Sequence, residues 1–108
     1  MYKRQAKAAL ETSVKYLSVD LGKNNIRVNA ISAGPMKTLA GAAISGARHV
    51  FKYSEKISPL QKNPDLEQVG NAALYLLSDI SSGVTGLTHY VDGGLKIVGT
   101  PNQDLVGI

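Results

Sequence analysis

The stretch Arg27–Thr38, with the sequence RVNAISAGPMKT, constrains the fold more than any other part of the chain. Its first half is rich in β-branched and small residues and predicts a buried strand over Ile26–Ser32. Gly34-Pro35 then ends the strand, because proline has no N–H to donate and glycine accepts unusual dihedral angles. Ligands of open α/β sheets bind at the loop that leaves the carboxyl end of a strand. The stretch therefore predicts a candidate binding loop, with an ordinary strand-ending turn as the alternative.

Two helices flank this strand in the sequence. The first is predicted over Ala6–Leu21, where one face recurs at steps of three and four residues. That face consists of Lys7, Leu10, Val14, Leu17 and Leu21. Asn63-Pro64 opens the second helix, with asparagine as the N-cap and proline in the first position. The apolar face of that helix consists of Leu66, Val69, Ala73, Leu76, Leu77 and Ile80.

Between the two helices, Thr38–Tyr53 contains small residues and glycines and predicts two short helices or a mobile helical flap. A loop is predicted over Ile57–Gln61, and a turn over Ser81–Gly86. A second strand follows at Leu87–Val91 and ends at an Asp-Gly-Gly turn. The order is helix, strand, helical flap, helix, strand, which indicates a parallel βαβ unit. Because parallel sheets need both faces covered, the chain is predicted to be an α/β fold that is incomplete on its own.

The composition limits the class of protein further. The 108 residues allow one domain at most, and they include no apolar run near the ~20 residues of a membrane-spanning helix. The absence of cysteine excludes a disulfide framework, a thiol nucleophile and a zinc–thiolate site, and the cytoplasm is the expected compartment. Neither His49 nor His89 has companion ligands at a suitable spacing, so we predict no metal site.

The net charge of +4 is unevenly distributed. The span Lys37–Lys62 is basic, with Glu55 as its only acid. It lacks the dense Lys/Arg clusters and interleaved aromatic residues of a nucleic-acid surface. An acidic partner could be attracted to this span, although a solvated helix face is the simpler interpretation.

Several of these segments resemble the C-terminal part of bacterial enoyl-acyl-carrier-protein reductases, which belong to the short-chain dehydrogenase/reductase superfamily. The matching segments are Lys7–Leu10, Asn29–Pro35, Thr38–Ala40, Val69–Ala72 and Val91–Gly94. The resemblance covers residues 6–98, leaving residues 1–5 as an unrelated start and 99–108 as a loose tail. It implies one partial domain, the C-terminal half of a Rossmann-like, doubly wound parallel sheet.

The resemblance also implies roles for individual residues. Lys7 matches the lysine that binds the ribose of NADH and supports the enolate formed after hydride transfer; its alternative role is a lysine that extends to water from the edge of an apolar face. Gly34 and Pro35 would let the main chain approach the cofactor. Met36 and Thr38 match positions that contact the nicotinamide carboxamide and the diphosphate.

Substrate and partner sites are implied in the same way. Leu39, Ala40 and Ile44 match the flap that orders over the acyl chain and excludes water, although a poorly specified helix would have a similar composition. Arg48 matches a basic residue that docks the acidic acyl carrier protein, and Lys52 lies one turn further on. Family members form homotetramers. No nucleic acid or membrane partner is expected.

Two features of the family have no counterpart in this sequence. The catalytic tyrosine of the family lies seven residues before the lysine, whereas Tyr2 lies five before Lys7 and so about 140° away around a helix. No glycine-rich turn between a strand and a helix is available for a dinucleotide. The sequence therefore predicts a fragment of an NADH-dependent enoyl reductase that needs an N-terminal half. The alternatives are a catalytically inactive product or assembly subunit, and a fragment of a 3-oxoacyl carrier-protein reductase.

Overall fold

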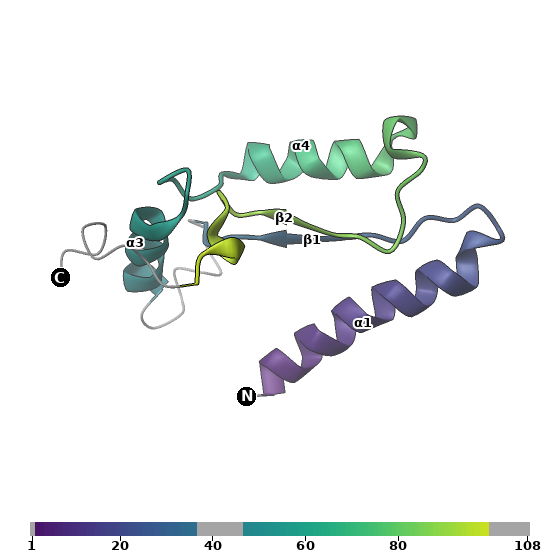
Figure 1. Ribbon diagram of the computed structural model, residues 1–108, viewed down its shortest axis with the longest axis horizontal. Helices are drawn as coiled ribbons and strands as arrows, with labels where there is room; N and C mark the ends of the chain where they lie inside the picture. The colour runs from purple at the N-terminus through teal and green to yellow at the C-terminus, as the bar shows by residue number, and fades with distance from the viewer. Residues whose placement is uncertain (1, 37–46, 100–108) are drawn as a thin grey trace. The chain divides into compact units, whose positions relative to one another are not determined.

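The computed structural model describes residues 2–36 and 47–99 of the chain. Its elements are α1 (Tyr2–Gly22), β1 (Ala30–Ala33), α3 (Ala47–Ile57), α4 (Leu66–Leu77) and β2 (Thr88–Val91), with two short 3-10 turns, η1 (Asp79–Ser81) and η2 (Leu95–Ile97). The strands lie side by side in one two-stranded sheet (Figure 1). No described helix is long and apolar enough to cross a bilayer.

The two strands are parallel, as the sequence predicts. The amide of Ala30 donates to the carbonyl of Leu87 at 2.8 Å, and the amide of Gly34 donates to Val91 at 2.9 Å. Residue numbers rise together along both strands, which is the pattern of a parallel ladder. This register places the carboxyl ends of β1 and β2 at the same edge of the sheet.

The chain divides into two compact units, Met1–Ile31 with Ala72–His89 and Ser32–Asn71 with Tyr90–Ile108. In the first unit, α1 begins four residues before the predicted start and buries Val14 and Ser18. The Ser18 side chain occupies the space that a side chain at residue 86 would fill. A Cβ on Gly86 would lie 2.9 Å from the Ser18 hydroxyl. This close approach sets how α1 packs within its own unit.

The strand predicted over Ile26–Ser32 is shorter and starts later, at Ala30. Ahead of β1, side chains replace part of the ladder. The amide of Val28 donates to the Thr85 hydroxyl at 3.1 Å, and the amide of Leu87 donates to the Asn29 side-chain oxygen at 3.0 Å. A polar side chain that bonds to the neighbouring backbone takes the place of a backbone partner, and therefore the regular strand begins only after Asn29.

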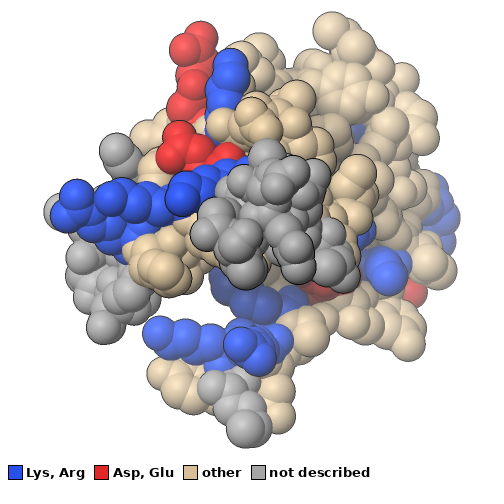
Figure 2. Space-filling view, turned by 60° about the vertical axis from the view of Figure 1, so that its left-hand side comes forward, with Lys and Arg blue, Asp and Glu red and all other residues tan. Residues whose placement is uncertain are grey.

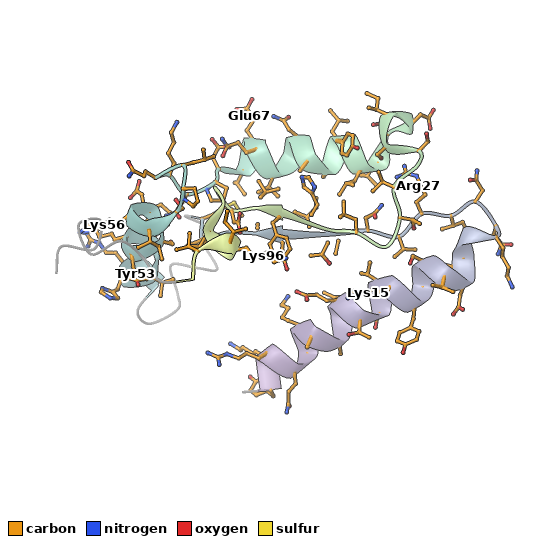
Figure 3. All side chains as sticks on the ribbon, viewed as in Figure 1. Lys15, Arg27, Tyr53, Lys56, Glu67 and Lys96 are labelled. Carbon is orange, nitrogen blue, oxygen red and sulfur yellow. The ribbon has the colours of Figure 1, made fainter. Side chains whose placement is uncertain are left out.

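Arg27 joins the segment before β1 to the turn η1 (Figure 3). One guanidinium nitrogen donates to the Ser81 hydroxyl at 2.9 Å and to the Val84 carbonyl at 3.2 Å. The other donates to the Ser78 carbonyl at 3.1 Å. Ser81 is 1% exposed, whereas Arg27 is half-buried, so these bonds are partly shielded from water. The planar guanidinium fits this fork of acceptors in a way that a lysine ammonium does not.

We expect Arg27→Lys to lower the free energy of unfolding by about 2 kcal/mol, because buried acceptors would lose charged donors. Urea unfolding followed by circular dichroism measures this change. Arg4→Lys on the exposed start of α1 is the matched control and should change the unfolding midpoint little. Equal midpoints for the two variants would contradict the role given to Arg27.

In the second unit, α3 ends at Ile57 and a loop leads to α4. The sequence assigned the N-cap of the second helix to Asn63, and this was wrong. Asp65 is the cap: its carboxylate accepts from the amide of Gln68 at 2.8 Å, while the Gln68 side chain accepts from the amide of Asp65 at 3.0 Å. This reciprocal pair is a capping box. Asn63 instead bonds to α3, where its side chain donates to the Phe51 carbonyl at 2.7 Å.

The far end of α4 also differs from the prediction. The helix ends at Leu77, and Ile80 lies in η1 with 84% of its surface exposed. Of the predicted apolar face, Leu76 is buried, Val69 and Ala73 are half-buried, and Leu66 and Leu77 are exposed. The face that periodicity identifies is therefore only partly covered by the described residues.

Candidate functional site

Lys7 lies on the first unit, on the inner face of α1. It precedes the buried Val14 by seven residues, which is close to two helical turns, so the two side chains point in nearly the same direction. Val14 is 7% exposed, whereas Lys7 is exposed on an open surface shared with Lys3 and Glu11. Within the described part of the chain, no hydrogen bond or ion pair engages the Lys7 ammonium. A cation in this position is available to a polar or anionic ligand.

Tyr2 is not positioned to act with Lys7. Helix α1 begins at Tyr2, and the side chain of Tyr2 is 75% exposed. Five helical residues separate the directions of the two side chains by about 140°. The regular start of α1 thus rules out the geometry in which Tyr2 could replace a tyrosine one heptad before the lysine.

The candidate binding loop leaves β1 in the second unit and begins with Gly34, Pro35 and Met36, all half-buried. A Cβ on Gly34 would lie 3.0 Å from Asp92 Cα and 3.2 Å from Pro64 Cδ. The packing of the protein itself therefore requires a small residue at Gly34. Contact between this main chain and a cofactor stays a prediction.

Asp92 holds the turn against which this loop packs. Its carboxylate oxygens accept from the amides of Gly94, at 2.9 Å, and Lys96, at 3.0 Å. The carbonyl of Gly93 accepts from the amide of Leu60 at 3.0 Å, which ties the turn to the loop after α3. With both oxygens bonded to backbone, Asp92 is a turn-stabilising residue and not an acid positioned for proton transfer. The sequence had favoured this interpretation.

An open hollow of about 710 Å³ adjoins the turn in the second unit. Its lining includes Pro64 and Asp92, the two residues that Gly34 contacts. Lys62 and Lys96 add positive charge, and the Lys96 ammonium lies 3.8 Å from the centre of the Tyr90 ring. A cation over an aromatic face is favourable in itself, so Lys96 already has an interaction there.

The predicted docking residues Arg48 and Lys52 lie on α3, and both are exposed. Lysine and arginine side chains stand out on the face of the molecule drawn in Figure 2, where acidic side chains are fewer. Thr38, Leu39, Ala40 and Ile44 lie outside the described residues.

The structure thus places Lys7 in one unit and Gly34–Met36, Arg48 and Lys52 in the other. Among the described residues, no three His, Cys, Asp or Glu side chains gather as metal ligands. Sequence reasoning missed Pro64 as a support of the binding loop. The only signal was its place before α4, and that signal was used to predict a helix start.

Comparison with known proteins gives consistent matches. A family model described as enoyl-(acyl carrier protein) reductase matches residues 2–96. An NADH-dependent enoyl-acyl-carrier-protein reductase of Rhizobium meliloti is 61% identical over 99 residues, covering 92% of this chain and 36% of that relative. The crystal structure of FabI from Candidatus Liberibacter asiaticus matches with a TM-score of 0.86 and 57% identity, over 91% of this chain and 38% of the other.

A further crystal structure, an enoyl-acyl-carrier-protein reductase of Anaplasma phagocytophilum in complex with NAD, has a TM-score of 0.83 and 56% identity. That match covers 89% of this chain and 37% of the other. The chain thus spans little more than a third of the length of these relatives. The similarity of this chain to these solved enzymes agrees with the α/β class predicted from the sequence.

Proposed function

Because this chain belongs to the enoyl-(acyl carrier protein) reductase family, we propose that it supplies the C-terminal part of an NADH-dependent reductase of trans-2-enoyl thioesters in fatty acid synthesis. One observation carries the proposal beyond family membership. Lys7 lies on the side of α1 that bears the buried Val14, and its exposed ammonium has no ion pair or hydrogen bond with a described residue. It is therefore available to donate to a polar or anionic ligand.

The family resemblance assigns three residues to a nicotinamide cofactor, of which Thr38 lies outside the described residues. Lys7 would donate to the ribose, the main chain of Met36 would contact the carboxamide, and the hydroxyl of Thr38 would contact the diphosphate. When bound, NADH supplies the hydride that reduces the double bond. Support for the loop comes from Gly34, whose packing against Asp92 and Pro64 fixes the backbone that leads to Met36.

The other assigned residues would act on the acyl group and its carrier. Leu39, Ala40 and Ile44 would cover the acyl chain and exclude water from the reacting carbon atoms. Arg48 and Lys52 would attract the acidic acyl carrier protein, since exposed cations raise the rate of encounter with an anionic surface. The proposed assembly is a homotetramer, and the proposed compartment is the cytoplasm.

A complementation experiment tests the proposal. The purified chain is mixed with the part of the Rhizobium meliloti relative that the match does not cover. We expect the mixture, and neither part alone, to oxidise NADH when crotonyl thioester is added. The reason is that the missing part would supply the tyrosine and the glycine-rich nucleotide turn. Loss of NADH absorbance measures the rate.

The choice of substrate separates the candidate reactions. Acetoacetyl thioester should give no NADH oxidation in the same mixture. Turnover of acetoacetyl but not crotonyl thioester would assign the chain to a 3-oxoacyl reductase. A mixture that forms a complex on a sizing column but oxidises NADH with neither substrate would contradict the proposed reductase function and favour an assembly role.

A further inference from the structure

The exposed face of α3 carries more positive charge than the two docking residues alone. Ser54 is 3% exposed and marks the buried side of the helix. At about 100° per residue, Lys52 and Lys56 point roughly 160° and 200° away from Ser54, and Arg48 about 120° away. The three cations therefore form one ridge along the outer side of α3. Lys56 projects from this helix in Figure 3.

The side chains of Arg48, Lys52 and Lys56 are exposed, and within residues 2–36 and 47–99 none of them forms an ion pair or a hydrogen bond. The one acidic residue of α3, Glu55, points about 20° away from the direction of Arg48 and forms no ion pair with the ridge. Each follows the previous one at four residues, the spacing at which like charges on a helix repel one another. An anionic partner that contacts all three would relieve this repulsion.

The opposite side of α3 is held in place, so the ridge is presented outward. The Ser54 hydroxyl lies 3.1 Å from the side-chain oxygen of Asn63 and 2.8 Å from the carbonyl of Val50. Asn63 in turn donates to the Phe51 carbonyl. These bonds attach the buried side of the helix to the loop before α4, which leaves the side bearing Lys52 and Lys56 free.

We propose that Lys56 is a third docking residue, and that an acidic helical surface of the acyl carrier protein lies along the whole ridge from Arg48 to Lys56. The inference rests on the proposed function, which names the carrier protein and assigns it to Arg48 and Lys52. It adds a residue near the C-terminus of α3, about two helical turns from Arg48. Charge complementarity selects this partner, because three aligned cations match a row of carboxylates.

Binding of acyl carrier protein to the purified chain tests the proposal, with calorimetric titrations at low and at moderate salt. We expect Lys56→Gln to weaken binding about threefold, which lies in the range for one exposed charge pair. Lys56→Glu should weaken binding about tenfold, because it replaces an attraction with a repulsion. The effect should shrink as salt is added, because salt screens exposed charges. Lys15→Gln and Lys15→Glu on α1 are the matched controls and should bind as the unchanged chain does.

The variants separate this inference from the proposed function. If Arg48→Glu weakens binding but Lys56→Glu behaves like Lys15→Glu, the ridge does not extend to Lys56, while carrier-protein docking stands. If the unchanged chain does not bind carrier protein, the ridge proposal is wrong, and the complementation assay with a free crotonyl thioester still tests the reductase. A cation in the last turn of a helix also stabilises that helix, which is an alternative role for Lys56. Melting curves of the Lys56 variants are therefore measured together with the titrations. A loss of stability with unchanged affinity would overturn the docking role.

Discussion

Replacing Gly93 by alanine is expected to destabilise the second unit by about 3 kcal/mol. Gly93 has φ +66, a left-handed conformation that costs any residue with a Cβ. The added Cβ would also lie 2.7 Å from the carbonyl oxygen of Lys62. That oxygen belongs to the backbone, so a rotamer change cannot relieve the contact. The turn must move, and Leu60 then loses its bond to the Gly93 carbonyl.

The melting temperature measured by circular dichroism should fall by roughly 10 °C or more in the Gly93→Ala variant. Gly70→Ala is the matched control. Gly70 lies within α4, and a Cβ there would meet nothing within 4 Å. Alanine favours a helix over glycine by about 0.5–1 kcal/mol, so this variant should melt at or above the original temperature. Similar losses in both variants would show that the Asp92 turn does not have the packing described.

Removing the charge of Lys7 is expected to reduce kcat/KM of the complemented reductase about 100-fold, which corresponds to about 2.7 kcal/mol of transition-state stabilisation. Lys7→Met keeps the length of the side chain and the helical preference of the residue while removing the ammonium. The loss should come from poorer cofactor binding and from weaker support of the negative charge that develops on the thioester oxygen. Rates of NADH oxidation with crotonyl thioester, at varied NADH, separate the two contributions.

Lys15→Met provides the comparison, because Lys15 is also exposed on α1 but points about 100° away from Val14. It should keep most of the activity. Circular dichroism should show equal helix content for both variants, since neither ammonium group has a bonding partner in the described residues. A Lys7→Met variant that keeps full activity would remove the residue from the cofactor site and leave it as an ordinary surface lysine.

The sequence predicted the helices, the strands and their parallel order because these follow from hydrophobic periodicity and from breakers such as Gly34-Pro35. The errors arose where a side chain bonds to distant backbone. Asn29 and Arg27 have partners more than fifty positions away in the chain, at Leu87 and Ser81, and no local pattern reveals them. Asn63 has nearer partners, at Phe51 and Ser54, but these also lie outside its own helix and no local pattern reveals them. An asparagine can either cap a helix or bond to the backbone of another element, and only the fold shows which of the two Asn63 does.

The candidate site was predictable to a smaller extent than the fold. Gly34 was identified by its place after a strand, and the structure adds that Asp92 and Pro64 fill the space beside it. Lys56 belongs to the basic span that the sequence predicts, but the sequence alone does not distinguish it from the other cations of that span. Whether these cations form a ridge depends on which side of α3 is buried. The burial of Ser54 identifies that side, and only the structure shows this burial.

The parallel ladder also determines the order in which this chain can fold during synthesis. Val28 and Asn29 bond to Thr85 and Leu87, residues 57 and 58 positions further along. During synthesis, α1 can form early because its bonds are local, but β1 can pair with β2 only after β2 has emerged. Until then the edge of β1 that β2 will occupy is open to other strands.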